Sequence, residues 1–373
     1  MDKRVILAVA GAGKTYHICH MVDPNKRNLI LAYTNQNIHN IQRELYHAHG
    51  CVPELTTVST FDSFVYHNLI LPYEPSIVGH FGHPAFVSRG ICTIEPPPKI
   101  IKNIKGKVSP NAKYFPKDRF AHYITNGRQY YCATLSELAL QVKQKQESLI
   151  KRAAARLNLF YDSVLIDEFQ DFREYDYDLI MALAKLLNNV ILVGDYHQHS
   201  VSATNNSGKP FKKKSNDVGY DDFVASLENA GFKVDTTTLN KSRRCSADIC
   251  NYVSEKLGIG IASHGENVGS VIWADDKAVE VLENRQIMKL VFKEAINYTF
   301  EALNWSYSKG DTLDAACVIL TDKFDGLDDE KYSTQGISIS TINKLYVAMT
   351  RSRGDLYLIK SSTFKKLKAA YII

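Results

Sequence analysis

The feature of the sequence that most constrains the fold is a glycine-containing segment near its start, residues 8–15, which reads AVAGAGKT. A short apolar run at residues 5–9 leads into this segment, and a helix-compatible stretch begins at Lys14. Glycines allow backbone N–H groups to turn toward phosphate oxygens, and the start of a helix adds a favourable dipole. The pattern therefore predicts a phosphate-binding loop between a buried strand and a helix, with Ala8 in place of the first glycine of the general pattern.

The side chains of this loop have separate expected roles. Lys14 would reach the β- and γ-phosphates of a nucleotide, and the Thr15 hydroxyl would be a ligand of Mg²⁺. ATP and Mg²⁺ are therefore the expected cofactors. A glycine turn without a ligand is the alternative reading. The candidate nucleotide-binding residues of the loop are Ala10, Gly11, Ala12, Gly13, Lys14 and Thr15.

A pair of acidic residues forms the second half of such a site. Asp167 and Glu168 directly follow an apolar strand expected at residues 163–166. Ligands of parallel sheets bind beyond the carboxyl ends of the strands, so both carboxylates would face the phosphate loop. Asp167 would hold Mg²⁺ together with Thr15, and Glu168 would accept a proton from the attacking water. Paired acids also occur in solvated turns, but the phosphate loop makes that reading the weaker one.

Three more residues complete the candidate catalytic set of Glu168, Gln198, Arg244 and Arg351. Gln198 follows an apolar strand expected at residues 190–193, where it would sense the γ-phosphate or orient water. An arginine delivered to the γ-phosphate stabilises negative charge in the transition state. Taken singly, each arginine could equally be a surface residue. The two histidines beside Gln198 are interpreted as part of a polar loop rather than as metal ligands.

The composition excludes several classes of protein. The 373 residues include 45 Lys+Arg and 40 Asp+Glu, which gives a formal net charge of +5, and 45% of them are hydrophobic. These values are ordinary for a globular protein of two domains. No stretch approaches the roughly 18 apolar residues of a membrane helix, and the N-terminus does not resemble a signal peptide. The seven cysteines contain no CxxC pair. We therefore expect a cytoplasmic protein with no membrane partner.

Strand-like and helix-like segments alternate along most of the chain, which predicts an α/β fold with parallel sheets and crossover helices. In the first part, strands are expected at 5–9, 28–33, 56–59, 163–166 and 190–193, and helices at 37–48 and 177–187. In the second part, strands are expected at 316–320, 336–341 and 355–359, and a helix at 344–350.

Residues 67–158 interrupt this alternation and are interpreted as a small insertion subdomain. Within them, residues 99–119 carry seven basic side chains against one acid, Asp118. Such a segment could contact nucleic-acid phosphates without sequence preference, or it could be a solvated lysine face. The insertion is expected to close with an amphipathic helix at 136–157, and a linker is expected at 203–220. The predicted units are a first domain of 1–66 plus 159–234, the basic insertion of 67–158, and a second domain of 235–373.

Seven motifs occur in a characteristic order: AVAGAGKT, LAYTNQN, TVSTFDSF, LIDEFQD, VGDYHQ, LNKSRRCS and LYVAMTR. In this order they resemble the motifs of superfamily 1 helicases of the UvrD/Rep type, over about residues 1–65, 160–202, 237–255 and 336–360. The chain is much shorter than a typical member of that family. The resemblance implies two RecA-like P-loop domains, with ATP bound in the cleft between them and single-stranded DNA across their tops.

The resemblance also assigns roles by position. It makes Gln198 the γ-phosphate sensor, and Arg244 and Arg351 two arginines that act on the nucleotide from the second domain. An aromatic ring in the DNA-contacting segments would stack on a base for roughly 1–3 kcal/mol, although core packing is an equally good reading of Phe61. The family leans toward 3′→5′ polarity. The residues that match the DNA-contacting segments are Thr34, Asn35, Thr60 and Phe61.

The chain departs from the family pattern in four places. The glutamine motif upstream of the phosphate loop is absent, and residues 199–203 replace the Trp-bearing segment that usually follows the third motif. The Lys-Gly-x-Glu part of the fifth motif has no counterpart. The stretch between Arg244 and Arg351 leaves no room for the large accessory insertion of the second domain.

Two functions from different classes follow from these observations. The first is an ATP-dependent translocase or helicase acting on single-stranded or partly duplex DNA. The alternative is a nucleotide-responsive DNA-binding subunit of a larger complex, with a partner protein such as a nuclease and little unwinding of its own. Because small family members are known in phage-defence systems such as Gabija, the resemblance also makes antiviral defence an expected setting. A relative that binds nucleotide without turnover is the weakest reading.

Overall fold

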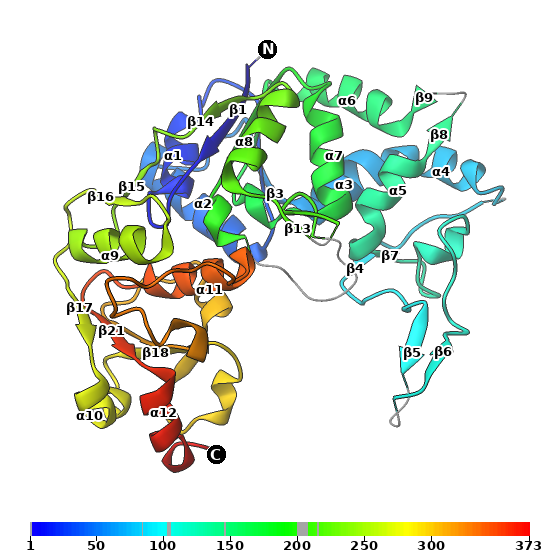
Figure 1. Cartoon of the computed structure of the whole chain (residues 1–373). Coiled ribbons are helices and arrows are strands. Elements are labelled where there is room, and N and C mark those ends of the chain that lie inside the picture. The colour runs from blue at the N-terminus through cyan, green and yellow to red at the C-terminus, as the bar shows by residue number, and fades with distance from the viewer. Residues whose placement is uncertain (1, 84, 103–105, 145–146, 200–207, 215) are drawn as a thin grey trace.

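The computed structural model describes residues 2–83, 85–102, 106–144, 147–199, 208–214 and 216–373. It contains two large parallel β-sheets, and helices connect the strands within each sheet (Figure 1). Each neighbouring pair of strands in the first sheet is parallel. The order of its six strands is β14 (Lys233–Asp235), β1 (Asp2–Leu7), β11 (Asn189–Gly194), β10 (Ser163–Ile166), β2 (Asn28–Ala32) and β3 (Thr56–Thr60).

The central strands of this sheet are apolar because both of their faces are covered. All five residues of β2 are buried, as are the last three residues of β10. Helices α1 (Lys14–Met21) and α2 (Asn35–His49) pack on one face of the sheet. Helices α3 (Phe61–Val65), α7 (Glu174–Ala184) and α8 (Tyr220–Asn229) pack on the other face.

The second sheet is built in the same way from the last third of the chain. Its five parallel strands run in the order β17 (Val271–Trp273), β21 (Leu356–Ile359), β20 (Ala316–Ile319), β18 (Met288–Val291) and β19 (Ala302–Asn304). Its helices are α9 (Ala247–Leu257), α10 (Ala278–Glu283), α11 (Ile339–Met349) and α12 (Ser361–Leu367). The predicted fold class is confirmed: the chain is an α/β protein with two RecA-like domains, each built on a parallel sheet.

Most of the predicted strands lie where the sequence placed them, to within one residue at either end. The exception in the first part is the strand expected at 5–9, which is β1 at Asp2–Leu7. The helix expected at 37–48 is α2, and the one expected at 177–187 begins and ends three residues earlier as α7. Short strand pairs at β12 (Lys212–Lys213) with β13 (Asn216–Asp217) and β15 (Lys241–Ser242) with β16 (Ala262–Ser263) were not anticipated.

The strand predicted at 336–341 is wrong, because α11 begins at Ile339. The residues that α11 buries include Leu345, Tyr346 and Met349, and Ile342 packs against the same core. These four positions have helical spacing and lie on one face of a helix. The alternation of Ile337 and Ile339 suggested a strand, but the apolar face that follows continues the helix back to Ile339.

The single helix predicted at 136–157 is also wrong. The chain instead forms α5 (Leu135–Gln141), a hairpin of β8 (Lys143–Gln144) and β9 (Glu147–Ser148), and α6 (Leu149–Phe160). Residues 143–147 are all polar and offer a helix no apolar side for the core. Ser148 then starts a new helix, because its hydroxyl accepts a hydrogen bond from the Lys151 N–H.

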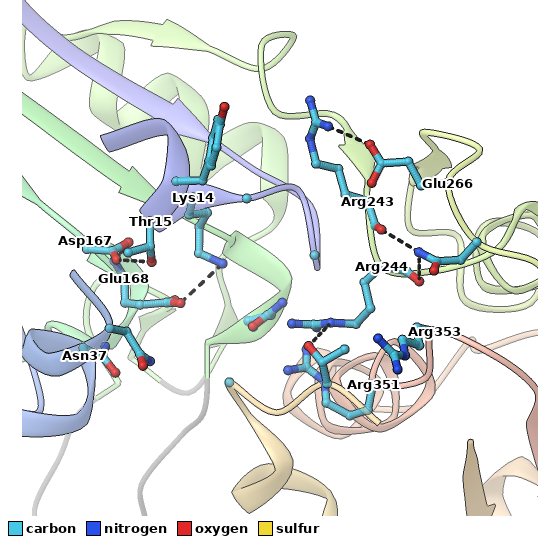
Figure 2. Close-up of a pocket in the computed structure, with 18 residues that line it drawn as sticks. Lys14, Thr15, Asn37, Asp167, Glu168, Arg243, Arg244, Glu266, Arg351 and Arg353 are labelled. Atoms are coloured by element: carbon cyan, nitrogen blue, oxygen red, sulfur yellow. Dashed lines mark hydrogen bonds and ion pairs between the residues drawn. The ribbon is translucent and has the colours of Figure 1, made fainter. Parts of the chain in front are cut away.

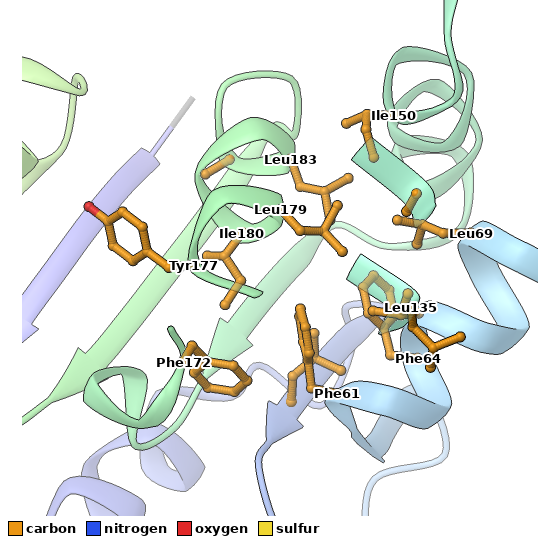
Figure 3. Packing of buried hydrophobic residues seen from close by; sticks show 14 of the residues in the cluster. Phe61, Phe64, Leu69, Leu135, Ile150, Phe172, Tyr177, Leu179, Ile180 and Leu183 are labelled. Carbon is orange, nitrogen blue, oxygen red and sulfur yellow. The ribbon is translucent and has the colours of Figure 1, made fainter. Parts of the chain in front are cut away.

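The residues between β3 and β10 extend to one side of the first sheet (Figure 1). Helices α3, α5 and α6 pack with α7 in one continuous apolar cluster, which Figure 3 shows around Phe61, Phe64 and Leu179. The basic segment lies farther out and forms the hairpin of β5 (Ile100–Lys102) and β6 (Val108–Pro110). The helix α4 (Glu74–His80) and the strand pair of β4 (Ile91–Cys92) and β7 (Tyr130–Tyr131) also lie in this region.

Within the part of the chain that the structure describes, no helix combines the length and the apolar composition needed to span a membrane. Part of the linker expected at 203–220, and residues 200–203 of the segment that replaces the Trp-bearing motif, lie outside the described residues.

The packing of Phe61 gives a testable expectation. Its ring is only 2% exposed and lies 4.9 Å from the ring of Phe172, edge to face. We expect Phe61→Ala to lower the free energy of unfolding by about 3–5 kcal/mol, because a large cavity is left in the core. The exposed Leu159→Ala is the control and should change it by less than about 0.5 kcal/mol. Chemical denaturation measures both, and unchanged stability of Phe61→Ala would contradict this packing.

Candidate functional site

The phosphate loop lies at the carboxyl end of β1, where it meets the segment 239–244. Gly11 and Gly13 have φ angles of 71° and 82°, a conformation that favours glycine. A Cβ on Gly11 would lie 2.6 Å from the Cβ of Arg244. The carbonyl of Gly11 also accepts a hydrogen bond of 2.9 Å from the Arg243 N–H. Glycine is therefore required here both for the turn and for the close approach of the second segment.

The first wall of the site brings Lys14 and Thr15 to the two acidic residues that follow β10. Lys14 is 8% exposed, and its Nζ lies 3.4 Å from Oε1 of Glu168. The Thr15 hydroxyl donates a hydrogen bond of 2.7 Å to Oδ2 of Asp167 (Figure 2). Since parallel strands end at the same edge of their sheet, the ends of β1 and β10 deliver all four side chains to one place.

The acidic pair has an uneven electrostatic environment. Burial, and next the charge of Glu168, raise the pKa of Asp167. Burial also raises the pKa of Glu168, but the charges of Lys14 and Lys309 outweigh it, so the pKa lies below its ordinary value. Glu168 is therefore held ionised by two ammonium groups. Its backbone is left-handed, with φ 52°, a strained conformation for a residue with a side chain.

Gln170 connects this acidic pair to the next strand. Its side-chain amide donates a hydrogen bond to Oε2 of Glu168, and its Oε1 accepts one of 2.8 Å from the Asp195 N–H. Asp195 follows β11 and is fully buried, and burial raises its pKa to about 6. The ends of β10 and β11 are thus joined through one side chain. The sequence pattern indicated no role for Gln170 or Asp195, although they lie within the motifs LIDEFQD and VGDYHQ.

The second wall comes from segments that pack beside the second sheet, and it is strongly basic. Nε of Arg244 donates 3.0 Å to the Thr312 hydroxyl, and a second guanidinium nitrogen lies 3.2 Å from the Thr350 carbonyl. Arg351 is 1% exposed, and its Nε donates 2.8 Å to the Val347 carbonyl. Among the described residues, neither Arg244 nor Arg351 has an acidic partner within ion-pair distance. A half-buried arginine and a fully buried one, both without a carboxylate partner, favour an anion between the walls.

A cavity of about 480 Å³ separates the two walls (Figure 2). It is lined by both groups of candidate residues, from the first wall Gly11, Gly13, Lys14, Thr15, Asp167, Glu168 and Gln198, and from the second wall Arg244 and Arg351. Arg243 and Arg353 also line it, but they pair with Glu266 at 2.7 Å and Asp314 at 2.6 Å. The four candidate catalytic residues and most of the candidate phosphate-loop residues therefore lie around one space.

Two predicted loop residues point elsewhere. The Ala10 N–H donates a hydrogen bond of 2.8 Å to the Tyr346 hydroxyl, so this donor faces α11 rather than the cavity. The same hydroxyl lies 3.3 Å from Oδ2 of Asp195. Ala12 is buried in the apolar layer with Ile18. Tyr346 was missed as a site residue because its contact joins positions far apart in the chain.

The four candidate DNA-contacting residues lie outside this cavity. The Thr34 hydroxyl caps α2 by accepting a hydrogen bond from the Asn37 N–H, and both Thr34 and Asn35 are exposed. The Thr60 hydroxyl caps α3 in the same way and is half-buried. Phe61 packs in the core, so in this structure its ring presents no face to a base. Thr34 and Asn35 come after β2, and Thr60 is the last residue of β3, so all three lie at the carboxyl edge of the sheet.

The oxygen donors of the first wall fit a hard divalent cation. Thr15 and Asp167 supply a hydroxyl and a carboxylate that are already adjacent, which suits Mg²⁺ when phosphates and water complete its shell. In the described residues, no three His, Cys, Asp or Glu side chains cluster as metal ligands. His199 is buried and stacks on Phe211 at 4.0 Å, so it is a core residue rather than part of an exposed loop.

Lys309 is the principal residue of the site that the sequence did not reveal. It belongs to the second-sheet part of the chain, but its Nζ lies 2.5 Å from Oδ1 of Asp171 and 3.6 Å from Oε2 of Glu168. Burial lowers its pKa, but Asp171 and Glu168 outweigh this and raise the pKa above the ordinary value of lysine. No motif pattern marks this lysine.

The parallel sheets and the phosphate loop define the chain as a P-loop protein. Residues 2–204 match the family described as "AAA domain", which is more than half of the chain, and the chain belongs to this family. The comparison with curated proteins gives no match.

Among solved structures, the chain is similar to a PRRSV helicase at 14% identity and a TM-score of 0.44, covering 99% of this chain and 54% of that one. It is also similar to the arterivirus nonstructural protein 10 helicase in complex with DNA, at 12% identity and a TM-score of 0.45, covering 98% of this chain and 63% of that one. The chain thus spans between 54% and 63% of the length of these structures.

The burial of Lys14 between carboxylates gives a prediction about pH. Lys14→Met removes the charge that opposes the raised pKa of Asp167, so ionised Asp167 becomes more costly in the folded state. We expect the variant to lose about 3–5 kcal/mol of unfolding free energy at pH 7.5. The loss should be smaller at pH 5, because Asp167 takes up a proton below its raised pKa.

Denaturation at the two pH values measures this difference. Lys26→Met is the matched control, because Lys26 is 59% exposed and pairs with Asp23 at 3.3 Å. It should change stability little at either pH. A loss for Lys14→Met that is equal at pH 5 and pH 7.5 would show that the carboxylates do not depend on this lysine.

Proposed function

We propose that this chain is an ATP-dependent translocase or helicase that acts on single-stranded DNA and hydrolyses ATP between its two RecA-like domains. The observation that carries the proposal is the cavity of about 480 Å³ with Lys14 and two carboxylates on one wall and two arginines without carboxylate partners on the other. A triphosphate is an anion of the charge and size that would join these walls. Membership in the AAA domain family supports the phosphate-binding part of the proposal.

Each residue of the first wall has a distinct part in the proposed reaction. Gly11 and Gly13 shape the loop that receives the phosphates, and Lys14 leaves Glu168 to pair with them. Thr15 and Asp167 would hold Mg²⁺, which would neutralise the negative charge that develops on the phosphates. Glu168, ionised in the free protein, accepts a proton from the attacking water. Gln198 lines the same cavity and orients that water or senses the γ-phosphate.

The second wall supplies positive charge from the other domain. Arg244 and Arg351 would approach the γ-phosphate when the cleft closes, which couples nucleotide binding to the relative position of the two domains. Hydrolysis would then let the cleft reopen. This coupling is what a motor needs in order to convert ATP turnover into movement along a strand.

DNA would cross the carboxyl edge of the first sheet beside Thr34, Asn35 and Thr60. Two of these residues are exposed at the start of α2, where backbone N–H groups favour phosphate. Thr34, Asn35 and Thr60 would contact the sugar-phosphate backbone of the DNA, whereas Phe61 packs in the protein core. The basic hairpin of the insertion is a further candidate surface for phosphates. The proposed UvrD/Rep type and 3′→5′ polarity come from the resemblance of the sequence motifs. The proposed units of 1–66 plus 159–234, 67–158 and 235–373 come from the alternation of strands and helices along the sequence.

Two substitutions separate nucleotide binding from hydrolysis. Lys14→Ala should abolish both, because no other side chain of the loop can reach the phosphates. Glu168→Gln should keep nucleotide binding and lower kcat by about 10²–10⁴-fold, the usual contribution of a general base. DNA-stimulated phosphate release and binding of a fluorescent ATP analogue measure the two effects. Lys26→Met is the control, and a wild-type chain without DNA-stimulated hydrolysis would end the proposal.

The second candidate function is a DNA-binding subunit that works with a partner protein such as a nuclease. It is favoured by apolar side chains exposed on the hairpin of the insertion, where Ile100, Ile101 and Val108 are 54%, 43% and 52% exposed. Exposed apolar side chains that gather on one element are typical of a protein contact. A phage-defence setting is a prediction of the family resemblance alone.

Strand displacement distinguishes the two functions. We expect the purified chain to unwind a duplex with a 3′ single-stranded tail when ATP and Mg²⁺ are present, and Glu168→Gln to be inactive in the same assay. If the wild-type chain hydrolyses ATP but separates strands only after a partner is added, the subunit is the correct function. A duplex with a 5′ tail tests the polarity.

A further inference from the structure

Among the residues that the structure describes, Lys309 is the one lysine that reaches from the second-sheet part of the chain to the carboxylates that follow β10. It follows the short helix η9 (Trp305–Ser308). Its Nζ contacts Asp171 at 2.5 Å and Glu168 at 3.6 Å, and both acids follow β10 of the first sheet. A single side chain therefore joins the two parts whose walls enclose the cavity.

The contact is largely removed from water. The side chains of Lys309, Asp171 and Glu168 are 19%, 19% and 18% exposed. Charges in such an environment interact more strongly than on the surface, and the loss of one partner leaves the other unpaired. Glu168 is thus held from both sides, by Lys14 at Oε1 and by Gln170 and Lys309 at Oε2. Its carboxylate has little freedom to turn.

Lys309 itself does not line the cavity, although its neighbours Gly310 and Thr312 do. Its Nζ meets Oε2 of Glu168, whereas Lys14, which lines the cavity, meets Oε1. It would therefore act through Glu168 and Asp171 rather than by touching a phosphate. This separates it from Arg244 and Arg351, which face the cavity.

The loop that carries Lys309 is anchored at both ends. Trp305 is fully buried, and its Nε1 donates 3.1 Å to the Leu290 carbonyl in β18. On the other side, Arg351 Nη1 lies 3.4 Å from the Ser308 carbonyl and 3.5 Å from the Asp311 carbonyl. The guanidinium that faces the cavity is therefore also the support of the Lys309 loop.

We propose that Lys309 is a positioning residue that fixes Glu168 and Asp171 against the second domain, and that its loop couples this contact to Arg351. The inference rests on the proposed ATP hydrolysis. An anion in the cavity that draws Arg351 away from the Ser308 and Asp311 carbonyls changes the support of the Lys309 loop. A movement of Arg351 would thereby change how firmly Lys309 holds the Glu168 carboxylate.

The test compares Lys309→Met with Lys309→Arg in steady-state ATP hydrolysis with saturating single-stranded DNA. We expect Lys309→Met to lower kcat by about 10–100-fold, the effect of a misplaced catalytic group, and to leave the KM for ATP within about twofold. Lys309→Arg keeps the charge across the cleft and should recover most of the rate. The control is Lys365→Met, which removes an exposed ion pair of 2.6 Å with Asp322 inside the second-sheet part.

A double-mutant cycle with Asp171→Asn tests the contact without turnover. Each single substitution leaves a buried charge unpaired, so we expect the combined fall in melting temperature to be smaller than the sum of the two. An active wild type with unchanged kcat in Lys309→Met, a higher kcat, or no rescue by arginine would overturn the inference alone. Additive melting shifts would also overturn it. A wild type without ATP hydrolysis would overturn the proposed function and this inference together.

Discussion

The burial of Lys14 against the carboxylates at the end of β10 is the interaction on which the site depends. An ammonium and ionised acids are costly to remove from water, and each is tolerated because the other is near. Lys14 lies 3.4 Å from Glu168, and Thr15 is hydrogen bonded to Asp167. The parallel order of β1, β11 and β10 makes this possible, because it brings the ends of segments more than 150 residues apart to one edge.

The second domain contacts both the phosphate loop and the acidic residues of the first domain. Its contacts with the phosphate loop are made by backbone and by one hydroxyl: the Arg243 N–H meets the Gly11 carbonyl, and the Tyr346 hydroxyl meets the Ala10 N–H. Its arginines face the cavity without carboxylate partners, whereas Lys309 is fully engaged by acids of the first wall. The second domain thus presents two arginines to a ligand in the cavity. Through Lys309 it also balances the charge of Glu168 and Asp171.

Local patterns in the sequence were enough to find most of this site. Asp167 and Glu168 directly follow an apolar strand, and Lys14 and Thr15 begin the helix after the glycine loop. These positions indicate which edge of the sheet the side chains reach. The wrong strand at 336–341 has a different cause, since a short run with isoleucine at alternate positions fits the start of an amphipathic helix as well. Lys309 and Tyr346 could not be found, because nothing next to them in the chain indicates the distant groups that they contact. The role of Phe61 could not be decided from the sequence either, because an aromatic residue after a strand is equally typical of a base-stacking surface and of a core.

A structure of the chain with ADP, Mg²⁺ and aluminium fluoride tests the central claim most directly, because it shows where the transferring phosphoryl group lies. The account predicts the fluoride complex between the two walls, in contact with Lys14 and with both Arg244 and Arg351, and the Mg²⁺ bound by Thr15 and Asp167. A nucleotide bound to the first wall alone, with both arginines still on their backbone carbonyls, would contradict it.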